Sequence, residues 1–155
     1  MVIQTRHFGE IDLDESKVIY FENGILGFEE CKKYTILYDD EDGKRPDISW
    51  LQSLDEVALA IPIISPFLAK TDYNPDIEDE LLKSLGELKD DNLAVFVSIT
   101  VPNDIEKITA NLKAPFIINT TERKGVQVIV ENPDYEVKYK FHEQLKQYKA
   151  SKGGE

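Results

Sequence analysis

The segment LAVFVSITV, residues 93–101, decides the fold of this chain. One set of alternate positions carries Leu93, Val95, Val97, Ile99 and Val101, and the other set carries Ala, Phe, Ser and Thr. An alternation with a period of two indicates a β-strand. Because apolar side chains occur on both faces, the strand is expected in the middle of a sheet, covered on both sides.

Strand signals continue outward from this segment in both directions. Val57–Ile61 has a similar character, but Pro62 follows it and lacks the amide hydrogen that a central strand donates, so an edge or a bulge is expected there. Numerous short strands with frequent turns and few helices favour a mostly β fold, a small closed or nearly closed barrel with short helical insertions. The further strands are predicted at Val2–Phe8, Ile11–Leu13, Val18–Phe21, Tyr34–Tyr38, Ser49–Leu54, Phe116–Asn119 and Val126–Val130.

Two segments have the spacing of a helix. The first begins at Asn74, an N-cap candidate followed by proline, and ends at Gly86, where a C-terminal glycine is typical. The second lies near the end of the chain, where Phe141, Leu145 and Tyr148 recur at i, i+4 and i+7 and predict an amphipathic helix. Between the last two strand signals, the turn at residues 122–125 predicts a hairpin in which Gly125 takes positive φ.

The charge divides the chain into two parts. The 155 residues carry a net charge of −12, with −15 in residues 1–136 and +3 in residues 137–155. We expect a barrel-like domain over 1–136 and a lysine-rich extension over 137–155 that is helical and then, from Ser151, disordered. The helix of the extension would dock either on the chain's own barrel or on a partner. An acidic body also argues against direct binding of nucleic acid, which requires a basic surface.

No enzyme is visible in the sequence. The two histidines, His7 and His142, stand in the terminal segments, and neither a nucleophile elbow nor a phosphate-binding loop occurs. The acidic run at residues 39–43 lacks both essential carboxylates of a calcium loop, so it is interpreted as a solvated loop. No metal or cofactor is expected. A single cysteine, no signal peptide and no apolar stretch of membrane-spanning length predict a cytoplasmic protein without membrane contact.

Several motifs point to a known family. The chain resembles the FliW family of bacterial flagellar assembly factors over roughly residues 2–136. It departs from the family where prolines often replace Glu22 and Leu26, and where members often end soon after Tyr139. The motifs that carry the resemblance are FENGILGFE (21–29), WLQS (50–53), SPF (65–67), TVP (100–102), TANLKAPFIIN (109–119) and KGVQ (124–127).

The resemblance implies a regulator without catalytic activity. Members of the family bind the RNA-binding repressor CsrA and block its action on flagellin mRNA, and flagellin releases CsrA by occupying FliW. The resemblance also implies a small β-barrel-like fold, in agreement with the strand pattern. An acidic body beside an RNA-binding surface would repel phosphates. The alternative from another class is a small-molecule-binding barrel or enzyme with its ligand in the barrel mouth.

Seven residues are candidates for contact with a partner. Phe67, after a proline in a loop, is expected to be an exposed aromatic anchor. Asn111 has two open interpretations, because its amide either fixes the backbone or meets a partner. The full set of candidates is Phe67, Asn111, Leu112, Pro115, Phe141, Leu145 and Tyr148.

Two motif features are interpreted as structural. Gly24 and Gly27 are expected to be positive-φ turn positions around a buried Ile25 and Phe28. Trp50 is expected in the core, since buried tryptophan is common in small β domains.

Overall fold

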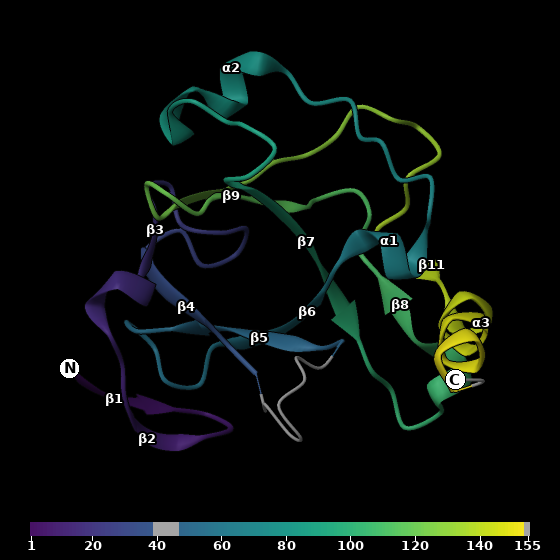
Figure 1. Ribbon diagram of the computed structural model, residues 1–155, viewed down its shortest axis with the longest axis horizontal. Helices are drawn as coiled ribbons and strands as arrows, with labels where there is room; N and C mark the ends of the chain where they lie inside the picture. Colours follow the sequence, from purple (N-terminus) through teal and green to yellow (C-terminus); the bar gives the residue numbers. More distant parts are fainter. Residues whose placement is uncertain (39–46, 154–155) are drawn as a thin grey trace.

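The alternating segment forms strand β7 (Leu93–Thr100), which runs through the middle of the fold (Figure 1). It pairs with β9 (Phe116–Asn119) along residues 93–96, with β6 (Ala60–Ile64) at residues 97–98, and with β8 (Thr109–Ala110) at residues 99–100. These partners on both edges of β7 confirm the prediction of a central strand. The computed structural model describes residues 1–38 and 47–153, with side chains as far as Tyr148.

Seven strands close into a barrel, which confirms the predicted fold class. Around the barrel their order is β7, β6, β5, β4, β3, β10, β9 and again β7, and Figure 1 views this ring nearly end-on. Every neighbouring pair is antiparallel except β10 and β3, which run parallel and complete the circle. The remaining strands of the ring are β3 (Ile19–Phe21), β4 (Lys33–Leu37), β5 (Ser49–Ser53) and β10 (Lys124–Gln127).

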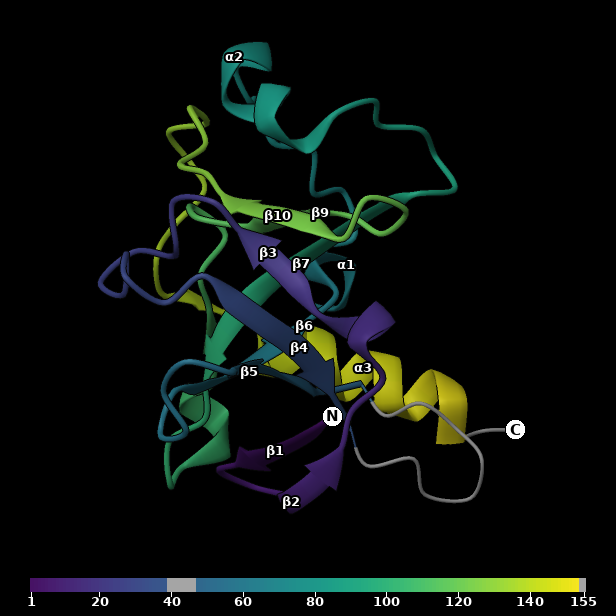
Figure 2. The same ribbon diagram turned by 90° about the vertical axis from the view of Figure 1, so that its left-hand side faces the viewer.

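The other elements surround the barrel. A separate hairpin of β1 (Val2–Thr5) and β2 (Gly9–Asp12) lies at one end (Figure 2). Strand β11 (Tyr139–Lys140) extends the sheet beyond β8. The helices are short, apart from the last. They are η1 (Glu15–Lys17), α1 (Pro66–Ala69), α2 (Asp79–Leu82), η3 (Lys83–Leu85), η4 (Ile105–Lys107) and α3 (His142–Gly153).

The core consists of two clusters. The first fills the barrel and includes Phe21, Tyr34 and Phe116, whose rings meet edge-on with centroids 5.2 Å (Phe21 and Tyr34) and 6.3 Å (Phe21 and Phe116) apart. The second lies between β7, β8 and the helices, and Phe141 belongs to it. Both are continuous layers of buried apolar side chains, which supply the main driving force for folding.

Pro62 occupies a position that the sequence prediction placed differently. The strand predicted at Val57–Ile61 is instead β6, at Ala60–Ile64, with Pro62 inside it. Pro62 lies opposite Trp50 of β5, and pairing with β7 begins only at Ile63, the next residue. The missing amide hydrogen is thus accommodated because β6 has a partner on one side only at that residue.

The predicted role of Gly125 is wrong. In the turn before β10, the positive φ of 57° belongs to Arg123, whereas Gly125 lies in the strand, which starts at Lys124 and not at Val126. Glycine is required at 125 for another reason. A Cβ there would stand 2.5 Å from Cζ of Phe21, the residue with which Gly125 pairs across the parallel contact.

The helix predicted from Asn74 is shorter than expected. Residues 74–78 belong to no helix. The amide of Asn74 donates to the Tyr135 hydroxyl (2.8 Å), and the amide of Asp76 donates to Asn132 Oδ1 (2.6 Å). These tertiary bonds replace the first helical turn. The helix begins at Asp79, and Gly86 follows it with φ of 77°.

The final helix is longer than expected. α3 continues to Gly153, past Ser151 where disorder was predicted, because its lysines and Ala150 favour helix. Gly154 and Glu155 lie outside the described residues, as does the acidic run at 39–43 that was interpreted as a solvated loop.

Substituting Gly125 tests the closure of the barrel. We expect Gly125→Ala to lower the free energy of unfolding by about 1–3 kcal/mol, since the Phe21 ring is fully buried among other rings and cannot move aside. Phe21→Leu should relieve the collision, so the double variant should lose less stability than the two single variants combined. Urea titration of the four proteins measures this coupling, and additive losses would contradict the proposed contact.

Two buried tyrosines provide a matched pair for hydrogen bonding. Burial raises the pKa of both Tyr34 and Tyr73. The Tyr73 hydroxyl donates to the carbonyl of Leu112 (2.8 Å), whereas the buried Tyr34 hydroxyl has no partner within residues 1–38 and 47–153. We expect Tyr73→Phe to cost about 1–2 kcal/mol and Tyr34→Phe to be neutral or stabilising by up to about 1 kcal/mol, as measured by urea unfolding. Equal losses would show that Tyr34 has a partner.

Candidate functional site

Helix α1 presents an aromatic side chain to solvent. Pro66 begins the helix, where a fixed φ suits the first turn, and Pro66 and Ala69 are buried against the body. Phe67 points away from this contact, and 52% of its surface is exposed. The amide of Lys70 donates to the carbonyl of Pro66 (2.9 Å) and completes the turn. A short, anchored helix therefore holds Phe67 at the surface, so the predicted exposure is confirmed, but Phe67 lies in a helix and not in the expected loop.

Helix α3 is seated on the body beside α1. Phe141, immediately before it, is 1% exposed and belongs to the same buried cluster as Ile99 and Ile108. Strand β11 leads into the helix and is held by its pairing with β8. Further along, the hydroxyl of Tyr148 donates to Asp47 Oδ1 (3.3 Å). The amphipathic stripe thus lies on the chain's own barrel.

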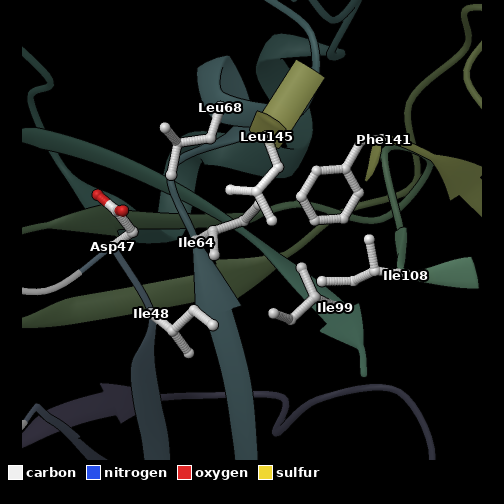
Figure 3. Close-up of a pocket in the computed structure, with 8 residues that line it drawn as sticks. All are labelled: Asp47, Ile48, Ile64, Leu68, Ile99, Ile108, Phe141 and Leu145. Atoms are coloured by element: carbon white, nitrogen blue, oxygen red, sulfur yellow. The ribbon is translucent and has the colours of Figure 1, made fainter. Parts of the chain in front are cut away.

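A hollow of about 230 Å³ lies between α3, α1 and the barrel (Figure 3). In Figure 3, Leu68, Leu145 and Phe141 lie on one side of Ile64, and Ile99 and Ile108 lie on another. The walls of the hollow are aliphatic and aromatic side chains, apart from the carboxylate of Asp47. The lining residues are Asp47, Ile48, Ile64, Leu68, Ile99, Ile108, Phe141 and Leu145.

Two further hollows adjoin the first. One of about 410 Å³ lies between Phe67, Tyr148 and the start of β5, and one of about 470 Å³ extends from Phe67 towards Tyr139. Leu68 lines all three hollows, and Phe67 and Tyr148 line two. We call Phe67, Leu68, Leu145 and Tyr148 the α1/α3 surface. Its aromatic and aliphatic side chains around concave hollows are typical of sites at which proteins dock.

The remaining candidates lie elsewhere. Leu112 and Pro115 are buried, so the expectation that they contact a partner is corrected, and the same holds for Phe141. Long-range packing buries them, which their local sequence does not reveal. Asn111 is half-buried, and its Oδ1 accepts hydrogen bonds from the amides of Lys113 (3.1 Å) and Ala114 (3.1 Å). Of the two interpretations of Asn111, the structure shows the one in which it fixes the backbone.

Sequence reasoning missed Leu68 and Ile48. Leu68 directly follows the SPF motif, and its place on the same short helix as Phe67 was the available signal. Ile48 lies between Asp47 and the first residue of β5, and no local sequence pattern indicates that it lines a hollow. Trp50 is half-buried and not in the core, since its ring stacks on His7 with centroids 3.9 Å apart.

Metal ligands and membrane-spanning helices were sought in the part of the chain that the structure describes. Within residues 1–38 and 47–153, no three His, Cys, Asp or Glu side chains gather as possible ligands of a metal ion. In the same part of the chain, no helix has both the length and the apolar character to cross a bilayer.

Comparison with known proteins gives a consistent family. The model of the family described as FliW protein matches residues 2–141. A flagellar assembly factor FliW from Lachnoclostridium phytofermentans is 57% identical over 155 residues, which cover 100% of this chain and 99% of the relative. One from Lachnospira eligens is 48% identical over 147 residues, covering 94% of this chain and 97% of the relative. A crystal structure of the flagellar assembly factor FliW superposes with a TM-score of 0.83 at 33% identity, covering 91% of this chain and 96% of that one.

The seating of α3 can be tested by truncating its anchor. Phe141→Ala should lower the free energy of unfolding by about 3–5 kcal/mol, because it removes a buried ring from the second cluster. Leu145→Ala, at a half-buried position, should cost less. Urea unfolding measures both losses, and hydrogen exchange should show α3 opening first in Phe141→Ala. A loss below about 1 kcal/mol in Phe141→Ala would mean that the helix is not anchored by this ring.

Proposed function

The chain belongs to the FliW family of flagellar assembly factors, and we propose that it acts in flagellum assembly by binding a CsrA-type repressor. In this proposal the bound repressor no longer represses flagellin mRNA, and flagellin is the competing partner that releases it. The full-length similarity to flagellar assembly factors carries the proposal. The function is protein binding in the cytoplasm, not catalysis.

The charge of the chain supports this choice of partner. A net charge of −12 favours association with a basic protein and slows association with RNA itself. RNA-binding proteins carry a basic surface for phosphate contacts. A bound acidic chain would therefore repel RNA from its neighbourhood even where it does not cover the RNA site.

The interior of the barrel supports docking on the surface over binding of a ligand inside. Phe21, Tyr34, Leu51, Ile63 and Phe116 fill the ring of strands, and each is at most 2% exposed. Small barrels of this kind are packed with their own side chains, whereas ligand-binding barrels keep a cavity. The surface of the molecule is where a partner would be recognised.

We assign the binding of one of the two partners, CsrA or flagellin, to the α1/α3 surface. Phe67 is an exposed aromatic side chain on a helix whose other face is buried, so binding costs little ordering of the backbone. Leu68, Leu145 and Tyr148 line the hollows beside it. In protein interfaces, aromatic side chains at well-packed pockets contribute a large share of the binding free energy.

Competition for RNA tests the proposed partner. The purified chain, mixed with CsrA from the same organism, should co-elute with it in size exclusion and reduce its binding to a flagellin leader RNA. Added flagellin should restore RNA binding. Normal RNA binding at saturating concentrations of the chain would reject the repressor as a partner.

The α1/α3 surface is tested with a matched pair of variants. Phe67→Ala should weaken CsrA or flagellin binding about tenfold in a calorimetric titration, without lowering the thermal midpoint. Val137→Ala removes an equally exposed side chain outside the three hollows and should leave both affinities unchanged. If Phe67→Ala lowers stability sharply and leaves binding per folded molecule intact, Phe67 acts in the fold and not in docking.

A further inference from the structure

The loop after β3 has a specific and costly conformation. Gly24 and Gly27 have φ of 66° and 85°, in the left-handed region that favours glycine. A side chain on Gly24 would also collide with the backbone of Glu29, whose carbonyl oxygen would stand 2.5 Å from the added Cβ. Ile25 and Phe28 form an isolated antiparallel bridge within the loop. The loop is therefore folded tightly back on itself.

This tight loop exposes apolar side chains. Ile25 is buried and anchors the loop, but Leu26 is 52% exposed and Phe28 is 46% exposed, which corrects the expectation of a buried Phe28. The amide of Leu26 donates to Oε1 of Gln127 on β10 (2.8 Å), so the tip is fixed to the barrel. A loop that needed only to connect two strands would not require this geometry. The conformation holds Leu26 at a defined place on the surface.

A second apolar side chain faces the same hollow from another element. Leu81 of α2 is 41% exposed and, with Leu26, lines a hollow of about 320 Å³. Ile25, Val126 and Val128 form the apolar ground between them. In Figure 2 α2 and β10 lie in the upper part of the view and α3 in the lower part, so this is a different face from the α1/α3 surface. We call Leu26, Leu81 and the hollow between them the loop–α2 surface.

The charges around this hollow are mainly negative, and Glu29 and Glu80 line it directly. Residues 21–30 carry Glu22, Glu29 and Glu30 and no basic side chain, and all three are exposed. On the other flank, residues 76–82 carry four exposed acidic side chains and no basic one: Asp76, Glu78, Asp79 and Glu80.

Two carboxylates near this hollow, those of Glu78 and Glu131, lie close enough to repel each other. Glu131 beside Glu78 raises the pKa of the Glu78 carboxyl through hydrogen bonding and like-charge repulsion. Lys83 pairs with Glu80 (2.9 Å), and both side chains are largely exposed, so this ion pair is weak and screened. An arriving cation would relieve repulsion here.

We propose that the loop–α2 surface docks a basic segment of a partner protein, with one bulky apolar side chain of that segment seated between Leu26 and Leu81. The hollow has room for one leucine or phenylalanine side chain, and the acidic rim attracts the lysines or arginines that flank it. A second copy of this chain is a poor occupant, because its net charge of −12 repels it. An anionic lipid surface or nucleic acid is repelled for the same reason.

Peptide titration followed by amide NMR tests the proposal on the whole chain. The probe is the capped peptide KKLFKK, and the matched peptides are EELFEE and KKSSKK. KKLFKK should shift the signals of Leu26, Leu81 and the Gln127 side chain, EELFEE should shift none, and KKSSKK should bind about five- to tenfold more weakly, the size expected for losing one apolar contact.

Variants assign the binding to the surface. Leu26→Ser and Leu81→Ser should each weaken KKLFKK about five- to tenfold with an unchanged thermal midpoint, since both side chains are exposed. Ile105→Ser, at an exposed position on η4, should leave binding unchanged. Glu29→Lys should weaken binding through charge. The probe is synthetic, so the outcome does not depend on the repressor or on flagellin.

Three results would overturn the proposal. The first is the absence of shifts from KKLFKK at millimolar concentration. The second is equal binding of KKLFKK by both serine variants and the unaltered chain, or equal binding of KKSSKK, because charge alone would then explain it. The third is a concentration-dependent dimer in sedimentation that Leu26→Ser abolishes, which would assign the surface to a second copy.

Discussion

The parallel contact between β3 and β10 closes the barrel, and the rest of the structure depends on it. The contact is short, with Lys124 opposite Tyr20 and Gly125 opposite Phe21. Because Gly125 has no side chain, the Phe21 ring can lie over β10 and reach Tyr34 and Phe116. Closure of the ring and formation of the inner cluster are therefore one event. The strands that carry α1 and the loop after β3 keep their relative positions only in the closed ring.

Side-chain amides hold the loops that surround the barrel. Gln52 is buried, accepts from the amide of Arg6 (3.0 Å) and donates to the carbonyl of Val57 (3.0 Å), so it joins the N-terminal hairpin to the loop after β5. Asn119 donates to the carbonyl of Leu85 (2.7 Å) and thereby fixes the end of η3. Gln127 and Asn111 act alike on their own loops. Each amide bonds to backbone groups that have no partner within a helix or strand. These residues explain much of the motif pattern without direct contact to a partner.

The sequence predicted the barrel better than the surfaces on it. Alternation along β7 depends on neighbours two residues apart, so a local pattern was sufficient to assign it. The roles of Gly125 and of residues 74–78 depend on Phe21 and on the segment 131–135, which are remote in the chain. The α1/α3 surface likewise joins side chains far apart in the sequence, and only the tertiary structure shows that Phe141 is buried. The exposure of Phe67 was predicted from the proline before it, although the sequence placed both residues in a loop and the structure places them in a short helix.

The order of the strands along the chain has a consequence for synthesis. Strand β3 ends at Phe21, but its parallel neighbour is complete only at Gln127, so most of the chain must leave the ribosome before the ring can close. At roughly 5–20 residues per second, β3 waits about 5 to 20 seconds with one edge unpaired. An unpaired strand edge is a template for association with other chains. The nascent protein is thus most exposed to aggregation during translation, and its safety in the cell depends on the speed of the ribosome and on chaperones that cover this edge.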